Sequence, residues 1–269
     1  MIIYIEHNSQ KFIVNTKDFI DLSIPYNFNG PQPNFYDVAP GRINALTIKN
    51  CSYLVSEGAG CNVPEVSLNI HCTGTHTEYV GHLLDVKGAV SSYIQDIIMP
   101  AGLITVESIP FIDCQDNYHV NVNEMEAVIC KKSIELQFQK LQKNKIKTLV
   151  IRTLPNPIEK KYYSYSKNIP PFFTNDAIIF LIENNIQHLV VDLPSIDRMQ
   201  DDGILGNHRI FWSKCSDPES KVSHDSLGTI TELAYIPNHV EDGFYFLNIQ
   251  TPHFQCDAAP SRPILIKPS

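Results

Sequence analysis

The stretch Pro170–Asp197, PPFFTNDAIIFLIENNIQHLVVDLPSID, decides the fold class of this chain. Thr174 is a suitable N-cap for the apolar run that follows, and Asn184 or Asn185 is suited to end that helix. HLVVDL then reads as a buried strand. A helix followed by a strand indicates an α/β protein, in which functional groups tend to lie at the carboxyl ends of strands. Asp192 and Asp197 occupy that position, although a cap or turn role also suits Asp197.

The rest of the chain contains many short strands and one further helix. Ile2–Glu6 and Lys11–Val14 read as strands around a turn, and Asn123–Lys143 has apolar residues at helical spacing. Further strands are expected at 44–57, 64–71, 101–109, 148–154 and 229–237, with a closing hairpin over 242–266. In the strand TITELAYIP, alternation places Glu232 on the same face as Ile230, Ala234 and Ile236. We expect one α/β domain spanning residues 1–269, with a mixed β core and outer helices.

The stretch His71–His82, HCTGTHTEYVGH, concentrates metal-binding side chains. Imidazole, thiolate and carboxylate are the groups that bind zinc and similar metals. In an extended segment, Cys72, His76, Glu78 and His82 share one face, whereas His71 points away unless a bulge at Gly74 redirects it. Five such groups in one short run favour a metal site over a set of unrelated surface residues.

Composition excludes several other classes of function. The 269 residues are 43% hydrophobic and 19% charged, which is typical of a soluble globular protein. A net charge of −8 gives no reason to expect nucleic acid or a membrane surface as partner. The N-terminus lacks signal-peptide features, and the seven cysteines include no CxxC pair, so we expect a cytoplasmic protein with reduced thiols.

Several motifs, in order along the chain, resemble the cyclase family of metal-dependent hydrolases. The family motif H-x-G-T-H-x-D-x-P-x-H is matched by His76 and His82, with Cys72, Glu78 and Val80 replacing its first His, its Asp and its Pro. DLSIP at 21–25, the stretch 171–197 and DAAPSRPIL at 257–265 also resemble family motifs. The resemblance implies a swivelling β/β/α fold and, by analogy, a homodimer or homotetramer.

The resemblance also implies a set of site residues. A divalent metal, zinc first and manganese second, would be held by Cys72 or His71 together with His76 and Glu78. His82 would be the general base, and His208 and Glu232 would orient or protonate the leaving group. His224, in a polar loop, is a weaker alternative to His208. Asp257 and Arg262 are expected to form a structural ion pair.

The activity implied for this site is hydrolysis of a small amide by a metal-activated water, with arylformamidase as the most specific prediction. A cyclase or dehydratase reaction at the same site is an alternative. A catalytically impaired metal- or ligand-binding protein is another, because Cys72, Glu78 and Val80 depart from the motif. NGPQPNFY at 29–36 is either a surface loop or an active-site flap that contacts a small-molecule substrate through Asn34, Phe35 or Tyr36.

Overall fold

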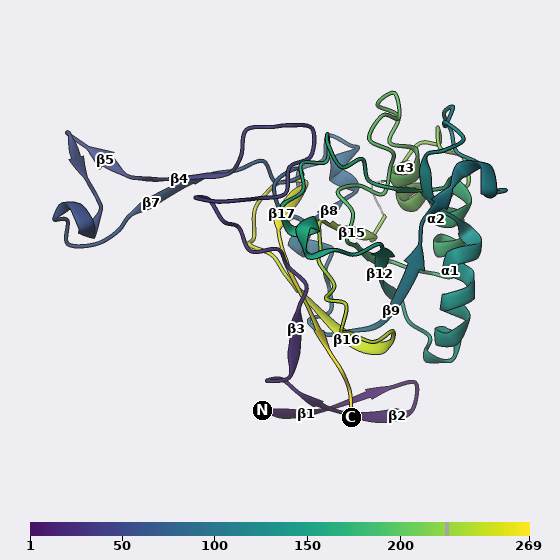
Figure 1. Cartoon of the computed structure of the whole chain (residues 1–269). Helices are drawn as coiled ribbons and strands as arrows, with labels where there is room; N and C mark the ends of the chain where they lie inside the picture. Colours follow the sequence, from purple (N-terminus) through teal and green to yellow (C-terminus); the bar gives the residue numbers. More distant parts are fainter. Residues whose placement is uncertain (224–225) are drawn as a thin grey trace.

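The computed structural model describes residues 1–223 and 226–269, and its centre is a mixed nine-stranded sheet (Figure 1). The strand order is β17 (Ala258–Pro260), β8 (His76–Tyr79), β15 (Thr229–Glu232), β14 (His188–Val191), β12 (Thr148–Leu154), β9 (Met99–Glu107), β16 (Gly243–Gln250), β18 (Arg262–Ile266) and β3 (Phe19–Asp21). Strands β15, β14, β12 and β9 are mutually parallel, and the other pairings are antiparallel.

Three helices cover one face of this sheet: α1 (Lys131–Phe138), α2 (Asn175–Glu183) and α3 (Gly206–Ser213) (Figure 1). Alternation along β12 explains how both faces are buried. Leu149 and Ile151 join the apolar core beneath the helices, whereas Val150 joins a second core on the other face with Leu22 and Ile236. Parallel strands buried on both faces read as continuous apolar runs, as β12 and β14 do.

The helix-and-strand prediction for 170–197 is confirmed. The Thr174 hydroxyl accepts a hydrogen bond from the Ala177 amide, α2 ends with Asn184 as its C-cap, and β14 follows. The helix predicted over 123–143 is partly wrong. Its first part forms β11 (Ala127–Ile129), which pairs with β10 (Ile109–Pro110) and β13 (Phe172–Phe173), and α1 begins only at Lys131.

Besides the small sheet of β10, β11 and β13, two further substructures lie outside the main sheet. The hairpin of β1 (Ile2–His7) and β2 (Gln10–Asn15), predicted from sequence, lies near the C-terminus (Figure 1). An arm of β4 (Arg42–Ala45), β5 (Thr47–Ile48), β6 (Cys51–Ser52) and β7 (Pro64–Ser67) projects away from the body (Figure 1). This arm exposes apolar side chains: Ile43, Ile48, Val55 and Val66.

The predicted face of Glu232 needs a correction. Ile230 packs in the core beneath the helices, whereas Ala234 and Ile236 pack in the core on the opposite face. Leu233 explains the difference, because its left-handed φ of 53° ends β15 at Glu232 and breaks the alternation.

No helix in 1–223 or 226–269 has the length and apolar character needed to cross a bilayer.

Candidate metal centre

Strand β8 lies between β17 and β15, and this strand order brings the residues of the site together. The register sets His76 opposite Glu232 and Glu78 opposite Ile230. Directly opposed residues of antiparallel strands project to the same face, so His76, Glu78 and Glu232 all point to one side. Glu232 ends a parallel strand, so the cluster lies at the carboxyl edge of the sheet, where α/β proteins place ligands.

Residues outside the strands complete the cluster. His208, on α3, places its Nε2 atom 2.9 Å from Glu78 Oε1 and 3.5 Å from Glu232 Oε1. His71, in the turn before β8, places its Nδ1 atom 3.1 Å from Glu78 Oε2. His82, in the short 3-10 helix Val80–His82, lies 3.9 Å from that oxygen through its own Nδ1 atom. Glu78 is therefore the common neighbour of three imidazoles.

The turn before β8 explains why His71 reaches this face although a regular strand would point it away. Residues 71–74 are not part of a strand, and β8 begins only at His76. Gly74 suits this turn, because a Cβ atom at this position would clash with the Tyr26 ring. A close approach of the Tyr26 ring therefore accompanies the turn that carries His71.

Asp257 is a member of the site that sequence reasoning assigned elsewhere. Its Oδ2 atom lies 2.9 Å from His71 Nε2 and 3.2 Å from His82 Nδ1. The predicted ion pair with Arg262 is wrong, since Arg262 Nε instead lies 2.7 Å from Asp21 Oδ2. The carbonyl of Asp257 accepts from the Tyr79 amide immediately before β17, which places this carboxylate beside the metal-binding stretch.

Asp197 fixes the orientation of His208. Its Oδ2 atom lies 2.6 Å from His208 Nδ1, and its carboxylate also accepts from the amides of Asn207 and His208 at the start of α3. Asp197 therefore has the predicted capping role and, in addition, contacts the imidazole of His208. This contact directs the Nε2 atom of His208 toward the two glutamates.

The charges of the cluster shift the pKa values of its members. Burial opposes the charged form of Glu78, but the charges of His82 and His208 outweigh it and hold the Glu78 pKa well below its usual range. Burial likewise disfavours a charged His208, but Glu78 and Asp197 raise its pKa well above the ordinary value. The nearby carboxylates of Asp257 and Glu78 outweigh burial at His71 and raise its pKa to about 10.

The donor atoms of the cluster fit a divalent cation. Ligand atoms of His71, His76 and Glu78 lie within 4.8 Å of one another, as do those of Glu78, His208 and Glu232. Nε2 of His76, Nε2 of His208 and both Glu78 oxygens are buried, and in the described part of the chain none makes an aligned hydrogen bond. Buried polar atoms normally have partners, and a metal held by His71, His76 and Glu78 would satisfy Nε2 of His76 and the Glu78 carboxylate.

The structure gives Cys72 a different environment from the imidazoles. Its thiol packs among Phe35, Tyr165 and Leu233, and burial together with the nearby charge of Glu232 raises its pKa to about 11. Within 1–223 and 226–269, the groups of three converging donors do not include it. Its role as a ligand stays a prediction, and the geometry favours His71 as the first ligand. His224 lies outside the described residues.

The Asn34–Tyr36 loop contacts the same region. The Phe35 amide donates to the Cys72 carbonyl at 3.0 Å, and the Tyr36 hydroxyl donates to the Met199 carbonyl at 3.0 Å. Phe35 is buried, whereas Tyr36 is half exposed. The pKa of Tyr36 is raised by partial burial and by the carboxylates of Asp201, Asp197 and Glu232. Of the three residues proposed to contact substrate, Tyr36 is therefore the most exposed.

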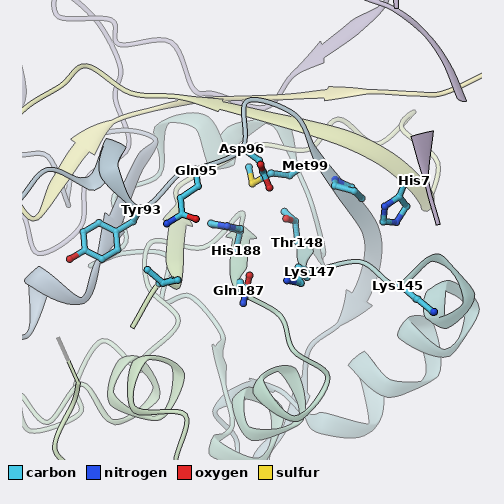
Figure 2. A pocket seen from close by; sticks show the side chains of 12 residues that line it. His7, Tyr93, Gln95, Asp96, Met99, Lys145, Lys147, Thr148, Gln187 and His188 are labelled. Atoms are coloured by element: carbon cyan, nitrogen blue, oxygen red, sulfur yellow. The ribbon is translucent and has the colours of Figure 1, made fainter. Parts of the chain in front are cut away.

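A separate pocket lies at the other end of the parallel strands (Figure 2). It has a volume of about 220 Å³ and is lined by residues at the amino ends of β9, β12 and β14, including Met99, Thr148 and His188. None of the lining residues belongs to the His/Glu cluster. The amino ends of parallel strands are not where such sheets usually bind ligands, so the cluster remains the candidate site.

Fold and cluster together define a protein with a mixed α/β sheet and, at the edge of that sheet, a histidine- and carboxylate-rich cluster suited to hold a metal ion. Residues 20–198 match the family model described as "Putative cyclase", which is more than half of the chain. The chain therefore belongs to the cyclase family.

Relatives and solved structures agree with this assignment. The chain is 22% identical over 259 residues to a kynurenine formamidase of Bacillus cytotoxicus, covering 94% of this chain and 99% of that protein. It is 24% identical over 204 residues to the Bacillus cereus kynurenine formamidase, covering 74% and 79%. An isatin hydrolase bound to thioisatinate superposes with a TM-score of 0.60 at 13% identity, covering 93% and 92%.

The solved structure of a predicted metal-dependent hydrolase from Bacillus stearothermophilus superposes with a TM-score of 0.58 at 16% identity, covering 92% of this chain and 97% of that one. At such identities the superpositions concern the fold alone. They confirm the predicted cyclase-like α/β fold. The prediction that residues 1–269 form one domain stays a prediction.

Proposed function

We propose that this chain is a metal-dependent hydrolase of a small amide, with an arylformamidase activity on N-formylkynurenine-type substrates. The observation that carries the proposal is that two groups of converging donor atoms, His71/His76/Glu78 and Glu78/His208/Glu232, share the buried carboxylate of Glu78. The kynurenine formamidases among its relatives suggest the substrate class.

His71, His76 and Glu78 are the residues proposed to hold the divalent metal, with zinc ahead of manganese. When bound, such an ion lowers the pKa of a water molecule and polarises a substrate carbonyl. Glu78 contributes negative charge inside a buried site, where one carboxylate offsets part of a cation's desolvation.

His82 is proposed as the general base. Its Nδ1 atom lies 3.2 Å from Asp257 Oδ2, so an N–H group at Nδ1 would donate a hydrogen bond to that carboxylate. This tautomer leaves Nε2 with a lone pair that can accept a proton from water. Asp257 thus positions His82 for its proposed role.

His208 is proposed to protonate the leaving nitrogen. Asp197 accepts from its Nδ1 atom, and the raised pKa keeps a proton on Nε2. Attack of water on the formyl carbon breaks the C–N bond, and the nitrogen leaves as an amine once it receives a proton. Glu232, which accepts from the Ile196 amide and faces Nε2 of His208, would orient that transfer.

The test combines metal analysis with activity. Purified protein should contain stoichiometric zinc or manganese, and it should hydrolyse N-formylkynurenine with activity that a chelator removes and added metal restores. His76→Ala should lose both metal and activity. His239→Ala, at an exposed imidazole, is the matched control and should lose neither.

Two outcomes would count against the proposal in different ways. Bound metal without turnover would redirect the search to other amides, lactones or the elimination and ring-closure reactions of the alternative hypothesis. A protein that binds no divalent metal under any condition would refute the mechanism.

Assembly and location stay proposals as well. We propose a homodimer or homotetramer, for which the projecting arm offers exposed apolar side chains at Ile43, Ile48, Val55 and Val66. Light scattering of the intact protein would test the oligomeric state. A cytoplasmic location likewise remains the expectation drawn from the sequence.

A further inference from the structure

A second group of side chains of metal-ligating types lies outside the His/Glu cluster, at the start of α1. It consists of Cys114, Asp116 and Cys130. The two sulfur atoms and a carboxylate oxygen all lie within 4.8 Å of one another. Cys114 and Asp116 follow the 3-10 helix Phe111–Asp113, and Cys130 is the N-cap residue of α1.

Hydrogen bonds hold these three side chains in place. Asp116 Oδ2 accepts from the Lys131 amide at 2.6 Å and from the Thr174 hydroxyl at 2.8 Å. The Asp116 amide donates to Cys114 Sγ at 3.4 Å, and Cys130 Sγ lies 3.1 Å from Ser133 Oγ. A carboxylate has about four lone-pair sites, so Asp116 keeps capacity for a further contact.

The group is accessible to an ion from outside. A pocket of about 440 Å³ is lined by all three residues, together with Asp113, Lys132 and Ser133. Both cysteines are free thiols rather than members of a disulfide. Cys130 is buried and Cys114 is partly exposed, so an ion would enter past Cys114.

We propose that Cys114, Asp116 and Cys130 form a second metal site, for a thiophilic divalent ion of the zinc class. Two thiolates and a carboxylate are ligands that zinc accepts in tetrahedral geometry, and the pocket leaves room for water as the fourth ligand. The His/Glu cluster offers only nitrogen and oxygen donors, so the two sites differ in ligand softness. The site shares no residue with the proposed hydrolase centre.

Cobalt(II) is a suitable probe, because cobalt bound by thiolates absorbs strongly in the near ultraviolet and cobalt bound by imidazoles and carboxylates does not. Metal-free protein under a non-thiol reductant should bind one equivalent of cobalt with this thiolate band. Cys114→Ser and Cys130→Ser should each weaken that binding at least tenfold. Asp116→Asn, which keeps hydrogen-bond acceptance without the charge, should weaken it less.

Matched cysteine variants separate this site from other thiols. Cys215→Ser, at an exposed thiol outside the group, should leave the band unchanged. Cys72→Ser should also leave it unchanged, which separates the second site from the predicted ligand of the hydrolase centre. A band that survives the Cys114→Ser/Cys130→Ser double substitution, or that disappears in Cys72→Ser, would overturn the proposal.

A measurement on the unaltered protein protects the test against misfolded variants. Zinc should slow the alkylation of Cys114 at least tenfold, read by mass spectrometry of the peptide, while the alkylation rate of Cys215 stays the same. Equal rates at Cys114 with and without zinc would refute the site even if every variant failed to fold. Amide hydrolysis should be unchanged in Cys114→Ser, so this proposal and the proposed function fail separately.

Discussion

The ion pair between Lys160 and Asp192 is expected to be a major contributor to stability, and Lys160→Met tests this. The Nζ atom lies 2.8 Å from Asp192 Oδ2 and also donates to the hydroxyl and carbonyl of Thr153. The side chains are only 7% and 0% exposed. Asp192, which sequence position suggested as a functional carboxylate, is therefore engaged by a buried cation at the end of β14.

The magnitude follows from this burial. At 2.8 Å and an effective dielectric constant of about 20, the attraction is about 6 kcal/mol, part of which is offset by the lysine's desolvation. Removing one partner of a buried pair typically lowers the free energy of unfolding by about 3–5 kcal/mol, because the other charge stays buried. That is a large fraction of the roughly 5–15 kcal/mol that stabilises a typical protein.

Urea unfolding of the wild type and of Lys160→Met measures the change. The matched control is Lys267→Met, whose ammonium lies at the same 2.8 Å from Glu241 but with side chains 61% and 78% exposed. That variant should unfold at the wild-type midpoint, because water screens an exposed pair. Adding Asp192→Asn to Lys160→Met should restore part of the loss. If Lys160→Met unfolded no earlier than Lys267→Met, the reasoning from burial would be refuted.

Three further predictions concern the metal centre and the pH dependence of stability. Glu78→Gln should lower metal affinity at least tenfold, because an amide brings no charge to the ion; full metal content by elemental analysis would contradict this. Asp197→Asn should lower kcat/KM for N-formylkynurenine about 10- to 150-fold, since a hydrogen bond to a charged group contributes about 1.5–3 kcal/mol; an unchanged value in folded protein would exclude positioning of His208. Burial lowers the pKa of His188 to about 4, below its unfolded value of about 6.5. Between these two pH values the unfolded state binds more protons than the folded state. The free energy of unfolding therefore falls as the pH falls through this window. His188→Gln should therefore lose less stability than the wild type between pH ~7 and ~4, by at most about 3 kcal/mol, and parallel losses in urea titrations would contradict the assignment.

The sequence by itself determined the elements whose signals are local. Thr174 and Asn184 bound α2 because capping depends on neighbours within one turn, and β12 and β14 follow from continuous apolar runs. The dense run of imidazoles and a carboxylate at His71–His82 likewise predicted where metal-binding groups lie in the chain. Family motifs added His208 and Glu232, which the structure brings to the same cluster.

Only the tertiary structure decided how distant residues pair. Asp257 lies 186 positions after His71 in the sequence. Its carboxylate contacts His71 and His82, and not Arg262, because β17 pairs with β8. The left-handed φ of Leu233 separates Glu232 from Ala234, and no periodicity in the sequence reveals it. Such pairings follow from strand order and loop path, which short-range patterns do not encode, because a side chain's partner is set by the packing of the whole sheet.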